Sequence, residues 1–338
     1  MTTTRSGMLR FSSVIFLSAF LLFQVQPMMG RYVLPWFGGG PAVWTNCMLF
    51  FQVLLLAGYA YAHWLGSLRS ARLQVSIHIP LLAASLLFLP IGPRSDIWKP
   101  ASSSDPSGRI LLLLAATVGG PYLLLSATGP LLQRWFSLSH SDESPWRLYA
   151  LSNFGSFLAL LSYPFVLEPL LRLNTQAWIW SGLYLAFAVL CGATAWRFRE
   201  THQVVAAAEP SPRPTLWTAL FWVGLAAAGS TLLLATTNQI CQEIAVIPFL
   251  WVLPLSIYLL TFILVFERDG WYHRLFFSVT MGLLAPLACG MMAAAVVLSL
   301  RLQIGAYLVV LFGACMLCHG ELARSRPAAR HLTAFYLS

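Results

Sequence analysis

Polar side chains that could bind a solute lie inside long apolar stretches of this sequence. They are six amides and one carboxylate: Gln24, Gln26, Asn153, Asn238, Gln239, Gln242 and Glu243. Polar groups are costly inside a bilayer, so they face one another, a pathway or a ligand. We therefore predict that these seven residues line a substrate pathway. The alternative is that the amides only join neighbouring helices, each hydrogen bond contributing about 1 kcal/mol.

Glu243 is the more informative of two carboxylates in apolar surroundings. No Lys or Arg lies in the segment around it, so its partner is an amide, a backbone group, a proton or a cationic substrate. Glu168, in contrast, is followed four residues later by Arg172, and this spacing predicts a simple ion pair at the membrane interface. We therefore expect Glu243, rather than Glu168, to be the functional carboxylate.

A cysteine motif near the end of the sequence offers a different chemistry. Cys315, Cys318 and His319 have the C-x-x-C-H spacing of covalent haem attachment. The first cysteine is embedded in an apolar stretch, which favours small residues at a helix interface as the interpretation instead. All six cysteines lie in or beside apolar stretches, and no His/Glu cluster has zinc-like spacing. We predict no disulfide, no metal site and no cofactor.

The composition indicates which elements must position these residues. Of 338 residues, 58% are hydrophobic and only 9% are charged, too few charges to solvate a soluble protein of this size. This excludes a soluble enzyme, a nucleic-acid-binding protein and a disordered chain. Ten apolar stretches are long enough to cross a bilayer as helices: 11–30, 43–65, 73–92, 110–132, 148–167, 175–195, 215–236, 244–266, 273–299 and 302–319. We predict an all-α polytopic membrane helix bundle of about 10–11 transmembrane helices.

The basic residues are distributed unevenly between the two predicted sides of the membrane. With the N-terminus in the cytoplasm, 14 of the 20 Lys and Arg residues fall on the cytoplasmic side and 6 on the outer side. Cytoplasmic loops of membrane proteins carry such an excess. The pattern predicts a cytoplasmic N-terminus, and it attributes the net charge of +9 to orientation in a lipid bilayer rather than to a nucleic-acid partner.

The chain divides at a polar stretch. Residues 196–214 are rich in Ala, Pro and charge, which predicts a cytoplasmic linker between a first six-helix membrane half, 1–195, and a second half, 215–338. A weak internal repeat at an offset of 213 residues supports this division, because Gln26 aligns with Gln239. The expected fold is therefore an MFS-like two-half layout, in which the substrate site lies where the halves meet.

Broken helices often border such a site, and prolines in the apolar stretches are the candidate breaks: Pro27, Pro35, Pro248 and Pro254. An eleventh helix begins near His331, but only eight residues are present, too few to span a bilayer. The second half is therefore expected to be incomplete, so that the sequence is C-terminally truncated.

Four long strings in the sequence support a resemblance to a known family. They occupy residues 20–64, 148–169, 236–264 and 318–338 and include LLFQVQPMMGRYVLPWF, LYALSNFGSFLALLSYPFVLEP and TTNQICQEIAVIPFLW. They resemble the membrane region of bacterial fused MFS/spermidine synthase proteins, and the resemblance covers nearly the whole chain. The Gly-Asp-Arg signature of typical major facilitator transporters is incomplete, since Gly66–Arg72 keeps the glycine and the basic residues but has no Asp.

The resemblance implies a bacterial inner-membrane protein that moves or channels a small, polyamine-like cation, with Glu243 as a cation contact. It also implies a soluble aminopropyltransferase-like domain fused downstream, which would use a decarboxylated S-adenosylmethionine-type donor and a diamine acceptor. No catalytic residue is carried over, because the expected nucleotide loop and paired acidic residues are not in this sequence. The alternative is a non-transporting membrane anchor for that aminopropyltransferase domain.

Overall fold

The computed structural model describes most of the chain as helix. The described residues are 2–38, 41–99, 107–140, 144–201, 214–243, 252–293 and 299–337, and every regular element within them is helical. Eight helices in these ranges are long and apolar enough to cross a membrane, and two shorter apolar helices accompany them. The prediction of an all-α, multi-pass membrane helix bundle is confirmed at this level.

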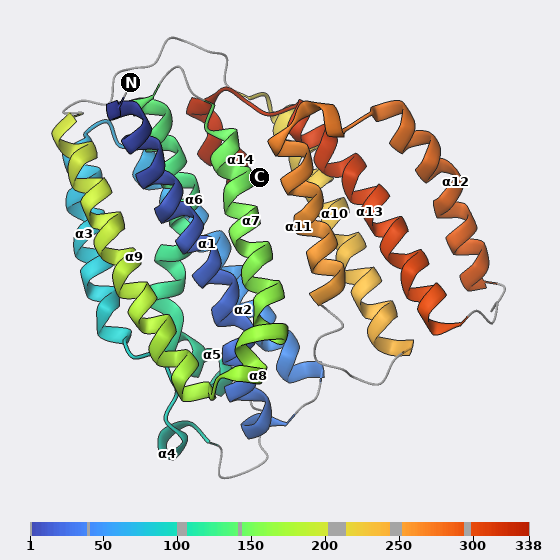
Figure 1. Ribbon diagram of the computed structural model, residues 1–338, viewed down its shortest axis with the longest axis horizontal. Coiled ribbons are helices and arrows are strands. Elements are labelled where there is room, and N and C mark those ends of the chain that lie inside the picture. The colour runs from blue at the N-terminus through green and yellow to red at the C-terminus, as the bar shows by residue number, and fades with distance from the viewer. Residues whose placement is uncertain are drawn as a thin grey trace.

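The helices before residue 202 form one group (Figure 1). They are α1 (Thr2–Phe37), α2 (Pro41–Ser67), α3 (Ala71–Ser85), α4 (Ser95–Trp98), α5 (Ser107–Leu114), α6 (Gly120–Ser139), α7 (Trp146–Ser162), α8 (Glu168–Leu170) and α9 (Leu173–Thr201). The central helix α1 packs against α2, α6, α7 and α9. Gly38, with φ +90°, ends α1 in a conformation that favours glycine.

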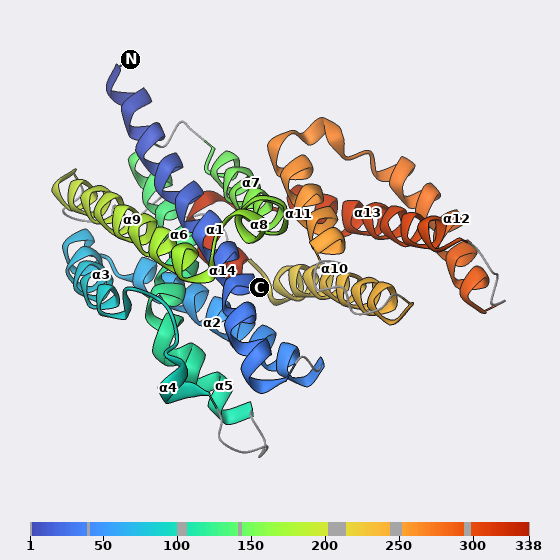
Figure 2. The same cartoon turned by 60° about the horizontal axis from the view of Figure 1, so that its bottom comes forward.

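The helices after residue 213 form a second group beside the first. They are α10 (Leu216–Glu243), α11 (Val252–Glu267), α12 (Arg274–Ala293), α13 (Leu300–Arg324) and α14 (Leu332–Leu337). Helix α7 joins the groups by packing against α11. The short helix α14 returns between the groups and contacts α2 and α6, as Figures 1 and 2 show.

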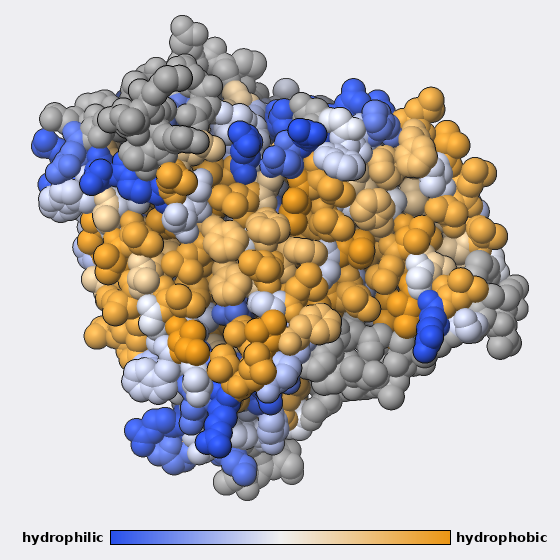
Figure 3. All heavy atoms as spheres, viewed as in Figure 1, coloured by the Kyte–Doolittle hydropathy of each residue, from blue (hydrophilic) through white to orange (hydrophobic). Residues whose placement is uncertain are grey.

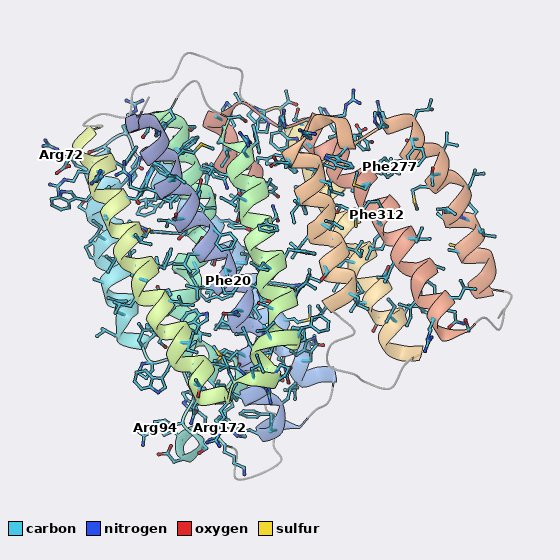
Figure 4. All side chains as sticks on the ribbon, in the orientation of Figure 1. Phe20, Arg72, Arg94, Arg172, Phe277 and Phe312 are labelled. Atoms are coloured by element: carbon cyan, nitrogen blue, oxygen red, sulfur yellow. The ribbon has the colours of Figure 1, made fainter. Side chains whose placement is uncertain are left out.

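A broad apolar band crosses the face of the bundle shown in Figure 3, between polar residues at its two ends. Large apolar side chains of the described residues are exposed, for example Leu87 and Trp217, whose exposed fractions are 86% and 81%. Such exposure is unusual for a soluble surface and ordinary for one that faces lipid. Arg72 lies at the end that carries the N-terminus, and Arg94 and Arg172 lie at the opposite end (Figure 4). Lipid is therefore the surrounding medium of the bundle.

The helix irregularities do not lie where the prolines predicted them. Helix α1 runs unbroken through Pro27 and Pro35, so the predicted breaks there are wrong. Pro254 lies in the first turn of α11, where its missing N–H removes no helical hydrogen bond, and Pro248 lies outside the described residues.

Two π-helical segments interrupt the helices of the first group instead. They are η2 (Ala115–Gly119), between α5 and α6, and η3 (Tyr163–Leu167), between α7 and α8. Pro121 follows η2 by two residues, and Pro164 lies within η3. A proline without an N–H shifts the hydrogen-bond pattern of the preceding turn, which is how a π segment can arise.

Candidate functional site

A cavity of about 270 Å³ lies where the two helix groups meet. Residues of both groups, including α14 of the second group, line it. They are Gln52, Leu55, Leu56, Tyr59, Tyr149, Trp222, Ala226, Phe262, Leu322, Phe335, Tyr336 and Leu337. Helix α2 supplies four of these residues, and α7, α10, α11, α13 and α14 supply the others. None of these lining residues is charged. The volume is slightly below the range of small-molecule pockets, roughly 300–1,000 Å³, so it suits a small solute.

Aromatic rings dominate the wall and contact one another across the divide. Tyr336 on α14 packs edge-on against Tyr59 on α2 and Tyr149 on α7, with ring centroids 5.3 and 5.2 Å apart. Tyr149 also packs edge-on against Phe262 on α11 at 5.8 Å. On the far side, Trp222 on α10 meets Phe335 at 5.1 Å. The aromatic rings that line the cavity therefore come from five different helices.

Tyr336 is held in place by a buried amide. The Nε2 group of Gln133 on α6 donates to the Tyr336 hydroxyl at 2.6 Å. Gln133 is completely buried, and its Oε1 atom is a hydrogen-bond acceptor without a partner among the described residues. A buried acceptor of this kind costs free energy unless it binds a donor. The unpaired Gln133 Oε1 atom thus belongs to the same amide that bonds Tyr336, a residue of the cavity wall.

The predicted site residues of the first half are occupied with contacts inside that half. Gln26 Nε2 donates to the Tyr122 hydroxyl at 3.2 Å and lies 3.5 Å from the Leu22 carbonyl oxygen. Gln24, two residues earlier on the same helix, is buried. Asn153 Nδ2 donates to the Tyr149 carbonyl at 2.9 Å, within α7. The Gln26 contact joins α1 to α6, the Asn153 contact stays within one helix, and none of the three residues lines the cavity.

The predicted site residues of the second half lie elsewhere than expected. Asn238, Gln239, Gln242 and Glu243 occupy the last turns of α10, beyond the predicted stretch 215–236. The predicted boundary is wrong because the helix continues past its apolar stretch into these polar residues. Asn238 is exposed and Gln239 is half-buried. The side chains of Gln242 and Glu243 lie outside the described residues, so the predicted cation contact of Glu243 stays a prediction.

The structure pairs Glu168 with a different arginine from the predicted one. Glu168 Oε1 lies 3.3 Å from Arg31 Nη1 at the end of α1. The predicted pair with Arg172 required a continuous helix, but α8 ends at Leu170 and the backbone of Leu171 is extended. The four-residue spacing therefore does not bring the two side chains onto one helix face, and the ion pair instead joins α1 to α8.

The residues of the C-x-x-C-H motif lie on α13 inside the second group. Cys315 and His319 are buried, and Cys318 is half-buried. Five cysteines in the described ranges are free thiols, and no group of three or more potential metal ligands occurs there. The haem interpretation gains no support from this arrangement, whose small side chains sit between packed helices.

The aromatic residues of the cavity were not among the predicted site residues. Tyr59 and Tyr149 lie within a few residues of Trp64 and Trp146 at the ends of apolar stretches, where a tyrosine is easily taken for a membrane-interface residue. The phenolic O–H could have identified them, because it is a polar group inside an apolar stretch, and the amides were selected on that same criterion.

These features define the class of the protein as a multi-pass α-helical membrane protein with an aromatic cavity between two helix groups. No protein-family model matches the chain, and no curated protein matches it either. Its particular function therefore has to be argued from the cavity.

Proposed function

We propose that the chain is the membrane part of a fused MFS/spermidine synthase-like protein of the bacterial inner membrane, and that it moves or channels a small polyamine-like cation. The observation that carries the proposal is the uncharged aromatic cavity between the two helix groups. The membrane domain and the position of the cavity fit a transporter, and the aromatic wall fits an ammonium ligand. The resemblance of residues 20–64, 148–169, 236–264 and 318–338 supplies the solute class.

The packing order of the helices supports a two-half plan. In the first group α6 packs against α1, α2 and α3. In the second group α13 packs against α10, α11 and α12. The fourth span thus contacts the first, second and third in both groups, as two copies of one arrangement would. Transporters built from repeats bind substrate where the repeats meet, and the cavity lies there.

The chemistry of the wall supports an organic cation as the solute. An ammonium group over the face of a Trp, Tyr or Phe ring gains about 0.5–2 kcal/mol. The cavity offers six such rings, those of Tyr59, Tyr149, Trp222, Phe262, Phe335 and Tyr336. The hydroxyl oxygens of the three tyrosines and the Gln52 carbonyl add hydrogen-bond acceptors for N–H groups. An anion would find no positively charged side chain among the lining residues.

Replacing Phe262 with Leu tests the cavity as a cation site. The change keeps an apolar side chain but removes one ring face, so the affinity for spermidine should fall between about twofold and thirtyfold, as the cation–π range implies. Spermidine binding to the purified protein in detergent and uptake by proteoliposomes are the measurements. The matched control is Phe276→Leu on α12, because Phe276 is 62% exposed toward the surroundings. Equal losses in both variants would count against the cavity.

The orientation follows from the charge distribution and has its own test. We expect Ser67, at the end of α2, on the cytoplasmic side and Ser95, at the start of α4, on the outer side. Each would be changed to Cys in a variant without the native cysteines. A membrane-impermeant thiol reagent added to intact cells should label Ser95→Cys and leave Ser67→Cys unlabelled. The opposite labelling would reverse the proposed topology.

A non-transporting anchor for an aminopropyltransferase domain is the second candidate. It is favoured by the contacts of Gln26, which joins α1 to α6, and of Asn153, which bonds within α7, because neither side chain lines the cavity. Two measurements distinguish the functions, because an anchor neither binds spermidine in the purified protein nor takes it up in proteoliposomes. If both signals are missing in the wild type, the transport proposal fails and the anchor is supported.

A further inference from the structure

Four arginines gather where α3 begins and α9 ends. Arg69 and Arg72 lie on either side of Ala71, the first residue of α3, and Arg197 and Arg199 lie in the last two turns of α9. Three of the four are exposed, and Arg199 is half-buried. Helices α3 and α9 pack against each other and lie side by side in Figures 1 and 2. We call these four arginines the α3–α9 basic patch.

Contacts inside the bundle determine how the two helices are aligned. Trp135 on α6 stacks on Phe198 of α9, with ring centroids 4.8 Å apart, and its indole N–H donates to Gln74 Oε1 of α3 at 2.7 Å. Phe198 and Gln74 therefore lie at about the same height. Further from this end of the bundle, Cys191 Sγ lies 3.8 Å from His78 Nε2, so the helices run antiparallel.

This alignment brings the arginines of the two helices to one level. Arg72 lies two residues before Gln74 on α3. Arg197 and Arg199 are the residues on either side of Phe198. At 1.5 Å per helical residue, these three arginines lie within about 3 Å of one height. The axes of packed helices are about 8–10 Å apart, so long arginine side chains from both helices can reach the same ligand.

The positive charge of the patch is not balanced by carboxylates nearby. Arg69 and Arg72 form no ion pair or side-chain hydrogen bond among the described residues. Glu200 is the only acidic residue in α3 and α9, and its Oε1 atom accepts a hydrogen bond from Trp196 Nε1 at 2.8 Å. Four positive charges against this single negative one leave a net charge of +3. An anionic ligand would balance it.

An exposed tryptophan places the patch at the membrane interface. The side chain of Trp196 is 49% exposed, and the guanidinium carbon of Arg199 lies 4.9 Å from the centroid of its ring. Exposed tryptophans of membrane proteins lie at the level of the lipid headgroups. Further along the two helices, exposed apolar side chains follow, among them Leu81, Val189 and Leu190. The surface thus offers guanidinium groups to a headgroup and apolar side chains to acyl chains.

We propose that the α3–α9 basic patch binds the phosphate of an anionic phospholipid, whose acyl chains lie along the apolar surfaces of α3 and α9. Guanidinium groups bind phosphate oxygens through paired N–H donors, and basic surfaces between transmembrane helices bind anionic headgroups. A zwitterionic lipid carries an additional cationic group, which the arginines repel. None of the four arginines lines the cavity, so the inference does not rest on the proposed function.

Binding of dioleoyl phosphatidylglycerol to the purified full chain tests the proposal. Native mass spectrometry measures it after copurified lipid has been removed, and the wild type should bind this lipid more tightly than dioleoyl phosphatidylcholine. Arg69→Gln combined with Arg72→Gln should lower the affinity by roughly thirtyfold, because each basic residue at a membrane surface contributes about fivefold. Arg69→Lys combined with Arg72→Lys keeps both charges and should retain most of the affinity.

The matched control is Arg172→Gln combined with Arg301→Gln. Both residues are exposed and lie outside the patch, and Figure 4 shows Arg172 at the opposite end of the bundle. This variant loses the same charge and should bind the lipid as the wild type does. Equal losses of affinity in the two glutamine variants would overturn the proposal. So would equal affinity of the wild type for the two lipids.

A soluble headgroup distinguishes a lipid site from a site for free phosphate compounds. Glycerophosphoglycerol has the same phosphodiester but no acyl chains, so it should not displace the lipid at an equal concentration. Displacement by it would show that the patch binds a soluble anion, and the lipid proposal would then be wrong. Spermidine plays no part in these measurements, so the proposed function can fail without affecting their outcome.

Discussion

Replacing Gly155 with Leu should reduce the free energy of unfolding by about 1–3 kcal/mol or more, the usual cost of overpacking. Gly155 lies on α7 where it crosses α1. A Cβ atom there would lie 2.9 Å from the Phe16 carbonyl oxygen and 3.5 Å from the Ala19 Cβ. The first of these neighbours is backbone and cannot rotate away. The two helices would have to separate, and with them the contact that holds α7 in the first group.

The matched control for this prediction is Gly182→Leu on α9. Nothing lies within 4 Å of a Cβ atom at Gly182, which is exposed. Leucine is the better helix former by roughly 0.8–1 kcal/mol, so this variant should be unchanged or slightly more stable. The apparent Tm of each purified variant in detergent is the measurement. If Gly155→Leu and Gly182→Leu have the same apparent Tm, the close approach of α1 and α7 is not important for stability.

Replacing Gln74 with Leu should have the second large effect. Trp135 Nε1 donates to Gln74 Oε1 at 2.7 Å, and Gln74 Nε2 donates to the Leu68 carbonyl at 2.6 Å. Gln74 and Trp135 are both completely buried. The substitution leaves the buried indole N–H of Trp135 without a partner, at about 1–3 kcal/mol, and also removes the hydrogen bond to the carbonyl of half-buried Leu68. The protein should therefore unfold at a clearly lower temperature, or at a lower concentration of denaturing detergent.

A double variant distinguishes lost hydrogen bonds from lost packing. Trp135→Phe removes the orphaned indole N–H, so Gln74→Leu combined with Trp135→Phe should be more stable than the sum of the single effects predicts. Residues in direct contact usually show such coupling, of about 0.5–3 kcal/mol. Additive losses would mean that the Trp135–Gln74 bond contributes little and that the cost of Gln74→Leu comes from elsewhere.

The membrane helices could be predicted because each depends on a long run of apolar residues. The stretch 43–65, for example, lies within α2, and 175–195 lies within α9. Helix ends were harder to predict, because hydrogen bonding continues where hydrophobicity stops. Helix α1 reaches from Thr2 to Phe37, well beyond the predicted 11–30, and α10 absorbs Asn238 in the same way. Pro27 and Pro35 were expected to break the first helix, but α1 continues through both of them.

The cavity could not be predicted, because it depends on the packing of helices that are distant in sequence. The Gln133–Tyr336 hydrogen bond joins residues 203 positions apart. Tyr336 belongs to the six-residue helix α14, which was expected only as the beginning of a longer helix. The amides were selected because polar groups are rare in apolar stretches. In the described structure Gln26 and Asn153 use that polarity for contacts within the first group, which a single sequence does not distinguish from solute binding.

The two sides of α7 differ in a way that bears on how the helix groups can move. Toward α1, Gly155 packs against the backbone of Phe16, and a Cβ atom at Gly155 would lie only 2.9 Å from the Phe16 carbonyl oxygen. Toward α11, it meets large rings, and Tyr149 lies against Phe262 and Phe266 with centroids 5.8 and 4.5 Å apart. Rings can slide and tilt over one another while remaining in contact, whereas backbone seated against a glycine cannot. Helix α7 should therefore travel with the first group as a rigid unit. Any alternation of access would take place along the seam of rings, where the cavity opens.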